Sequence, residues 1–153
     1  MAGELASVSG FPLALDRGYH PDSHMWVLGV ETGRVRIGLD ALGVETSGTL
    51  AELSFHPVKS ALTKGRPFGQ LEAAKFVGPL VSPVSGTLLA VNAKAALDPG
   101  LVERDPYGEG WLIEAQLEDE AAALAGLLSD PEEITAWFSA RVVHYRLQGV
   151  LAE

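Results

Sequence analysis

The chain contains no cysteine among its 153 residues. This absence excludes disulfides, thiolate metal sites and a cysteine nucleophile, so any sulfur redox chemistry has to come from an attached group. Basic residues are also scarce, with 11 against 20 acidic residues and a formal net charge of -9. Because a phosphate backbone or an anionic membrane surface repels such a chain, we expect neither nucleic acid nor a membrane as a partner.

Long apolar runs are missing as well. No stretch approaches the roughly 18 to 20 consecutive apolar residues of a membrane-spanning helix. Residues 1–17 lack the basic start and apolar core of a signal peptide, and Glu4 and Asp16 are unusual in a transit peptide. We therefore expect a cytoplasmic protein, and its length and 47% apolar composition predict one domain with a single core.

Short apolar segments bounded by Gly, Pro and Ser dominate the middle of the chain. They are typical of β-strands in a small barrel or sandwich. The predicted strands span residues 25–30, 34–39, 49–55, 67–73, 77–81, 87–91 and 111–117. Gly33 can supply the positive φ of a turn between the first two, which predicts a hairpin, and Asp40 is placed to cap a short helical turn.

The composition changes after residue 117. The Ala- and Leu-rich run 118–128 favours a helix, and Pro131 predicts the start of a second helix near Ser129 or Asp130. Ile134, Trp137 and Phe138 would form its apolar face. We therefore divide the chain into a loosely ordered segment 1–18, a main domain 19–138 and a tail 139–153, which either extends the helix or docks elsewhere.

Lys75 lies at the turn between two of the predicted strands. A lone exposed lysine at the tip of a hairpin suggests a covalent attachment point, although such a lysine is more often only a solvated turn residue. Nothing in the sequence resembles a phosphate-binding glycine loop or a nucleophile elbow, and the four histidines show no metal-site spacing. We therefore predict a carrier with neither catalytic residues nor a metal. His24 is either a partner contact or simply hydrogen-bonded.

Four motifs in order from Tyr19 to Leu112 resemble the glycine cleavage system H protein family of lipoyl carriers. The second motif precedes Lys75 and the third follows it, and the last is the most recognisable block of the family. The motifs are Tyr19-His20-Pro21-Asp22-Ser23-His24-Met25-Trp26-Val27, Lys64-Gly65-Arg66-Pro67-Phe68-Gly69, Ser82-Pro83-Val84-Ser85-Gly86 with Val91-Asn92, and Asp105-Pro106-Tyr107-Gly108-Glu109-Gly110-Trp111-Leu112.

The resemblance implies a mainly β fold, the lipoyl-domain-type flattened barrel-sandwich hybrid, with helices at its C-terminal end. It places the lipoylated lysine at Lys75 and makes lipoic acid the cofactor. Glu72, three residues before, and Gly86, eleven after, occupy the positions that the lipoylating enzyme recognises. Ala73, Ala74 and Phe76 depart from the family pattern Glu-Ser-Val-Lys-Ala.

The implied function is to shuttle an aminomethyl group on lipoyl-Lys75. The implied partners are a lipoate ligase or a lipoyl or octanoyl transferase, together with glycine decarboxylase, aminomethyltransferase and dihydrolipoamide dehydrogenase. Two alternatives stay open: a lipoate-binding carrier of heterodisulfide-reductase-like sulfur oxidation, and an unmodified interaction module. Biotin carriers fit less well, because they place the lysine between methionines. The loop 105–110 would cap the sandwich edge, with Tyr107 and Trp111 packed on it, and could line a groove for the loaded arm.

Overall fold

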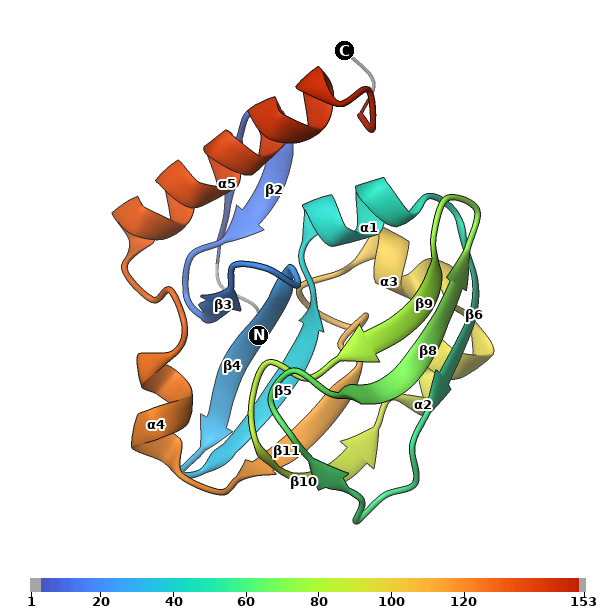
Figure 1. The fold of residues 1–153 in the computed structure, drawn as a ribbon, viewed down its shortest axis with the longest axis vertical. Helices are drawn as coiled ribbons and strands as arrows, with labels where there is room; N and C mark the ends of the chain where they lie inside the picture. The colour runs from blue at the N-terminus through green and yellow to red at the C-terminus, as the bar shows by residue number, and fades with distance from the viewer. Residues whose placement is uncertain (1–3, 152–153) are drawn as a thin grey trace.

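The structure, a computed structural model, describes residues 4–151 as three antiparallel sheets with helices at their edges (Figure 1). The first sheet is a hairpin of β1 (Leu5–Val8) and β2 (Phe11–Ala14). The second has the order β3 (Gly18–His20), β4 (Met25–Glu31), β5 (Arg34–Leu39), β11 (Ile113–Leu117), β10 (Gly86–Val91), β7 (Ala61–Leu62). The third has the order β6 (Leu50–Phe55), β8 (Pro67–Ala73), β9 (Val77–Val81).

Five helices complete the described part of the chain. They are α1 (Ala41–Ser47), α2 (Ala93–Leu97), α3 (Gly100–Arg104), α4 (Glu120–Ala125) and α5 (Pro131–Leu147). Asp40 caps α1 by accepting from the Gly43 amide, and Asp130 caps α5 in the same way through Glu133, as their positions before each helix predict. None of the helices in residues 4–151 is long and apolar enough to cross a membrane.

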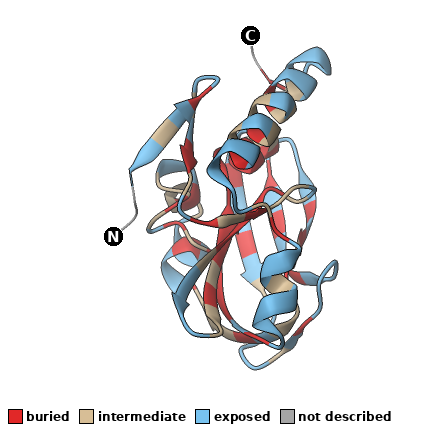
Figure 2. Ribbon diagram, turned by 90° about the vertical axis from the view of Figure 1, so that its left-hand side faces the viewer, coloured by how far each residue is buried: buried red, intermediate tan, exposed pale blue. Residues whose placement is uncertain are grey.

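The main core lies between the six-stranded and three-stranded sheets. Alternate residues of the facing strands point into it, among them Ile37, Leu71 and Ile113. A second cluster lies under α5, where Ile134, Phe138 and Val142 are fully buried. Figure 2 shows these buried positions along the side of α5 that faces the sheets, while the short α4 has no buried residue.

The predicted strands correspond closely to β4, β5, β6, β8, β9, β10 and β11, and the mainly β fold with C-terminal helices is confirmed. The helix predicted over residues 118–128 is only six residues long, because no apolar stripe of it is buried. Helices α2 and α3, between β10 and β11, were not predicted from the sequence.

The N-terminal segment differs from expectation. We expected residues 1–18 to be loosely ordered, but residues 5–14 form the β1–β2 hairpin, whose turn residues Ser9 and Gly10 both have positive φ. Leu13 is fully buried in the cluster under α5, so this order depends on a helix from the other end of the chain. Residues 1–3 of this segment, and 152–153 of the tail, lie outside the described residues.

The tail from residue 139 continues α5 up to Leu147, which is one of the two outcomes that the sequence left open. Val142 and Leu151 are buried in the same cluster as Leu13. The segment boundaries at residues 18 and 138 remain a prediction, and α5 crosses the second of them.

Candidate functional site

Lys75 lies in the turn between β8 and β9, as predicted, and its side chain is exposed. The Ala73 amide donates to the Phe76 carbonyl at 2.8 Å and closes the turn. Within residues 4–151 the ammonium has no hydrogen bond or ion pair. The lysine is therefore presented to solvent at the tip of the hairpin, beside α1 in Figure 1.

Backbone contacts with the end of α1 fix this turn. The Lys75 amide donates to the Ser47 carbonyl at 2.8 Å, and the Ala74 amide donates to the Thr49 carbonyl at 2.9 Å. Gly48 makes the approach possible: its φ is 79°, and a Cβ there would lie 3.1 Å from Lys75 Cγ. The turn is thus held rigidly while the lysine side chain stays free to move. This role of Gly48 in holding the lysine turn was not predicted from the sequence, although the residue follows a short capped helix.

Glu72, the first predicted recognition residue, is exposed on β8, three residues before Lys75. It is paired across the strands with Glu52 of β6 on one side and Val77 of β9 on the other. Two opposed carboxylates repel each other and gain nothing for the sheet. An exposed acidic pair next to the hairpin tip therefore has no evident structural purpose, and it is open to an approaching enzyme.

Gly86, the second predicted recognition residue, lies in β10 between Leu62 of β7 and Leu117 of β11. A Cβ at this position would overlap the carbonyl oxygen of Gln116. The close approach of β10 and β11 therefore requires glycine here, whatever else the residue does. Its recognition by a lipoylating enzyme stays a prediction.

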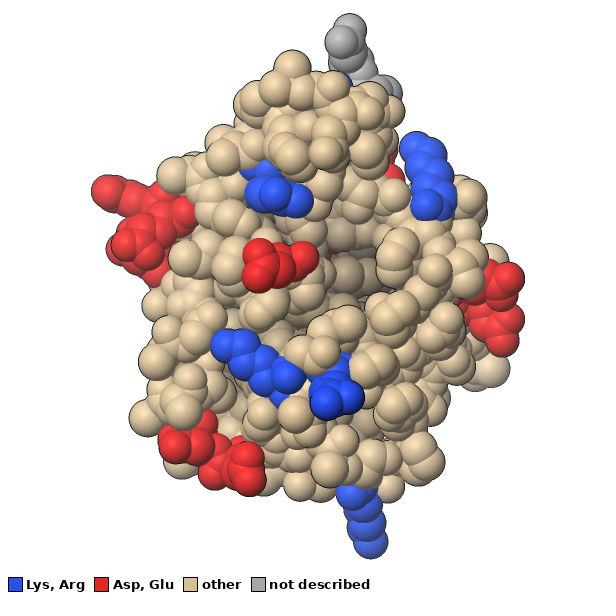
Figure 3. All heavy atoms as spheres, in the orientation of Figure 1, with Lys and Arg blue, Asp and Glu red and all other residues tan. Residues whose placement is uncertain are grey.

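A cavity of about 370 Å³ lies next to the lysine turn. Phe76, the neighbour of Lys75, forms part of its wall, with Met25, Leu39 and Leu80 as further apolar lining. In the space-filling view the molecule is hollowed near the centre of this face, between β3, α1 and β9 (Figure 3). An apolar chain of a few carbon atoms attached to Lys75 would find these apolar side chains next to the turn.

The polar side of the same cavity carries two histidines. His20 Nδ1 lies 2.9 Å from Ser23 Oγ, and burial lowers the pKa of His20 below its ordinary value, so this ring is neutral at neutral pH. His24 is buried, with Nδ1 2.9 Å from Asp40 Oδ2 and Nε2 2.7 Å from the Tyr145 hydroxyl. Of the two interpretations that the sequence left for His24, the structure shows the hydrogen-bonded one.

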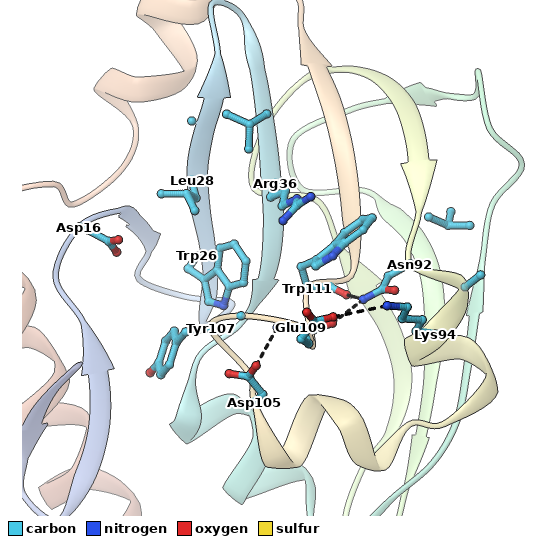
Figure 4. A pocket seen from close by; sticks show the side chains of 15 residues that line it. Asp16, Trp26, Leu28, Arg36, Asn92, Lys94, Asp105, Tyr107, Glu109 and Trp111 are labelled. Atoms are coloured by element: carbon cyan, nitrogen blue, oxygen red, sulfur yellow. Dashed lines mark hydrogen bonds and ion pairs between the residues drawn. The ribbon is translucent and has the colours of Figure 1, made fainter. Parts of the chain in front are cut away.

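The loop 105–110 lines a different cavity of about 820 Å³, with Trp26, Arg36 and Trp111 around it (Figure 4). None of residues 74–76 lines this cavity, and a groove for the loaded arm along this loop stays a prediction. The loop does cap the sheet edge. Asn92 Nδ2 donates to the carbonyls of Glu109 and Trp111 at 2.8 and 2.7 Å.

Tyr107 ties this loop to the rest of the molecule. Its hydroxyl donates to the Pro12 carbonyl at 2.8 Å and accepts from the Ala41 amide at 3.0 Å. Burial raises the pKa of Tyr107 far above its ordinary value, so the hydroxyl keeps its proton. Within residues 4–151, no three His, Asp or Glu side chains come close enough together to hold a metal ion.

The fold and the site define a carrier-type β-domain that presents one unpaired lysine on a fixed hairpin. Comparison with known proteins agrees. Residues 18–140 match the family model described as Glycine cleavage H-protein. The glycine cleavage system H protein of Mycobacterium sp. (strain KMS) is 41% identical over 112 residues, covering 72% of this chain and 86% of that protein.

Further relatives give the same answer. The glycine cleavage system H protein of Salinibacter ruber is 38% identical over 110 residues, covering 71% of this chain and 88% of its own length. The crystal structure of a glycine cleavage system H protein from Mycobacterium marinum aligns with a TM-score of 0.64 at 32% identity, covering 69% of this chain and 87% of that one.

The chain belongs to the glycine cleavage H-protein family. Members of this family are lipoyl carriers and not enzymes, so the predicted class of protein and the lipoyl-domain-type fold are confirmed. The relatives do not favour a sulfur-oxidation carrier or an unmodified interaction module.

Proposed function

We propose that Lys75 is the lipoyl attachment site of this carrier. The observation that carries the proposal is the exposed, unpaired Lys75 ammonium on a turn whose backbone is fixed by Ser47 and Thr49. A modifying enzyme can enclose such a side chain without unfolding the sheet. That enzyme would recognise Glu72 on the exposed face of β8. Gly86 would contribute to recognition by keeping β10 close to β11.

The residues around Lys75 fit a lipoyl group. Its short apolar chain matches the apolar wall formed by Phe76, Met25 and Leu80. When bound, the group would supply the dithiolane sulfurs that this cysteine-free chain lacks, and with them the means to carry an aminomethyl group. The side chains of the cavity would then receive the arm between visits to partner enzymes and limit its contact with water.

The partners follow from this proposal. A lipoate ligase or a lipoyl or octanoyl transferase would load Lys75, and glycine decarboxylase, aminomethyltransferase and dihydrolipoamide dehydrogenase would use the arm in turn. All of these enzymes would act at the same hairpin. Covalent attachment to Lys75 would keep the cargo near whichever enzyme is bound and so raise its effective concentration there. The compartment we propose is the cytoplasm.

The test is co-expression with a lipoyl ligase and free lipoate, followed by intact-protein and peptide mass spectrometry. We expect one lipoyl increment on the peptide containing Lys75. The variant Lys75→Arg should keep the fold, because the side chain is exposed, and should lose the increment. Lys64→Arg, also on an exposed turn, is the matched control and should be modified normally. An increment that persists on Lys59, Lys64 or Lys94 in Lys75→Arg would contradict the assignment.

A second variant tests recognition. Glu72→Gln keeps the size of the side chain and removes its charge, and it also relieves the repulsion from Glu52. We expect slower lipoylation with unchanged or slightly raised thermal stability. Glu52→Gln, which relieves the same repulsion, should be lipoylated at the normal rate. Equal lipoylation rates for both variants would show that the charge of Glu72 is not recognised.

A further inference from the structure

Two aromatic side chains of α5 pack against His24, one of the residues that line the cavity beside Lys75. His24 lines the cavity, and its ring packs against Trp137 and Tyr145 with ring centroids 5.3 and 5.6 Å away. Its Nε2 atom lies 2.7 Å from the Tyr145 hydroxyl. Trp137 lies within the match to the family model, which ends at residue 140, whereas Tyr145 lies beyond it, so the Tyr145 part of this support comes from outside the match.

The hydrogen bonds around Tyr145 have one consistent direction. Arg141 Nη2 donates to the Tyr145 hydroxyl oxygen at 2.8 Å, and Arg141 Cζ lies 4.7 Å from the centre of the tyrosine ring. Among residues 4–151, His24 Nε2 is the one hydrogen-bond acceptor that the hydroxyl reaches. In a neutral imidazole, this arrangement makes Nε2 the acceptor of the hydroxyl proton. The proton of the imidazole is then on Nδ1 and is donated to Asp40.

The same chain of hydrogen bonds continues to the lysine turn. Asp40 Oδ1 accepts from the Gly43 amide at 2.8 Å and so caps α1. At the other end of α1, the Ser47 carbonyl accepts from the Lys75 amide. His24 itself has a φ of 58°, a conformation that non-glycine residues rarely adopt and that contacts on both sides of the ring have to maintain. The C-terminal segment, the cavity wall and the lysine turn are thus physically connected.

We propose that Tyr145 is a positioning residue for the arm cavity. It holds the His24 imidazole in one tautomer, with Nδ1 protonated, and in one orientation in the cavity wall. The inference rests on the proposed function of Lys75 and assigns to the segment beyond residue 140 a part in it. Without the hydroxyl, Nε2 loses its donor, so no hydrogen bond on that side of the ring holds its orientation or excludes the Nε2-protonated tautomer.

The first test uses the unmodified protein. Nitrogen-15 NMR of the imidazoles should show His24 as the Nδ1-protonated tautomer in the wild type. Tyr145→Phe keeps the ring contacts and removes only the hydroxyl, and it should shift the Nε2 signal and mix the tautomers. Leu147→Ala, in the same last turn and 84% exposed, should leave the His24 signals unchanged. Identical His24 signals in wild type and Tyr145→Phe would overturn the proposal, even if the melting temperature fell.

The second test uses the lipoylated protein with its arm reduced by a phosphine. The rate at which a thiol-alkylating reagent reacts with the arm measures how well the cavity protects it. We expect a rate about fivefold higher in Tyr145→Phe, the factor that one ordinary hydrogen bond represents, and no change in Leu147→Ala. Equal rates in wild type and Tyr145→Phe would overturn the proposal.

The two tests separate this inference from the proposed function. A protein that is lipoylated on Lys75 but shows unchanged His24 signals overturns the role of Tyr145 alone. A protein that no ligase modifies on Lys75 overturns the proposed function and, with it, the purpose of the cavity wall.

Discussion

At the scale of single residues, Trp26 and Trp111 both lie in motifs of the family but differ in burial. Trp26 is 1% exposed, and its Nε1 donates to the carbonyls of Leu39 and Pro106 at 3.1 and 3.0 Å. Gly38 lies directly under its ring, where a Cβ would overlap the indole. Trp111, at the recognisable family block, is only half-buried, and Arg36 Cζ lies 4.8 Å from its ring centre.

We expect Trp26→Ala to lower the free energy of unfolding by about 3 to 5 kcal/mol, because it opens a cavity and leaves two carbonyls unpaired. Trp111→Ala should cost only about 1 to 2 kcal/mol, since part of its ring already contacts water. Urea unfolding of both variants measures the difference. Should Trp26→Ala fail to fold, Trp26→Phe gives the same comparison with Trp111→Phe. Equal losses at the two positions would show that Trp26 is not the buried ring.

A second prediction at this scale concerns Gly86. Gly86→Ala forces the new methyl group against the backbone of Gln116, and separating β10 from β11 should cost about 1 to 3 kcal/mol. Gly29→Ala is the matched control, because Gly29 also lies in a strand and has nothing within 4 Å of a Cβ. Thermal unfolding measures the loss of stability in each of the two variants. If both substitutions are tolerated equally, packing does not explain the glycine.

At the scale of elements, β5 and β11 are joined by an ion cluster as well as by their backbone ladder. Glu114 of β11 is 6% exposed and accepts from Arg34 and Arg36 of β5, the latter at 2.7 Å. Burial alone would raise the pKa of Glu114, but the hydrogen bonds and charges of the two arginines outweigh burial and leave the pKa below its ordinary value. The ionised form is therefore favoured by folding.

The sign of the pH dependence follows directly. A carboxyl group with a depressed pKa in the folded state stabilises the protein above its unfolded pKa of about 4.3, and this contribution is lost as the pH falls through the folded value. Glu114→Gln should therefore be less stable than wild type at pH 7, and the difference should narrow at acid pH. Urea unfolding across this range measures it, with the exposed Glu118→Gln as control. A difference that stays constant with pH would exclude the cluster as its cause.

At the scale of the whole molecule, two clusters of buried side chains share the same strand. Met25 and Val27 of β4 belong to the core between the sheets, and Trp26, between them, belongs to the cluster under α5. Because the first three residues of β4 are buried and contribute to both clusters, the two clusters are joined through this strand. The N-terminal hairpin and the C-terminal helix therefore stabilise the domain as one unit.

We expect a single cooperative unfolding transition, with far-ultraviolet circular dichroism and tryptophan fluorescence changing together. Leu13→Ala, which removes a fully buried side chain under α5, should lower stability by about 2 to 5 kcal/mol and shift both signals equally. A fluorescence transition that precedes the loss of strand signal would instead show that the cluster under α5 melts as a separate unit.

Local rules were sufficient for most of the fold. Apolar segments bounded by Gly, Pro and Ser predicted β8 and β9 to the residue, and capping chemistry located the starts of α1 and α5, because these signals depend on neighbours in the chain. The same rules missed the order in β1 and β2 and the helices α2 and α3. The hairpin is ordered by α5, and α2 and α3 are five residues each, with one buried residue apiece and little periodicity to detect.

For the site, the sequence by itself placed Lys75 at a turn between two strands, and the family motifs on either side of it made Lys75 the predicted attachment site. It also determined the family and the absence of any thiol in the chain. The tertiary structure alone decided what surrounds Lys75: the end of α1 that fixes its backbone, the cavity beside Phe76 and the hydrogen bond between Tyr145 and His24. Those contacts join residues far apart in the chain, 121 positions in the last case. No local pattern encodes such a distance, since only the packing of α5 against the sheets brings the two side chains together.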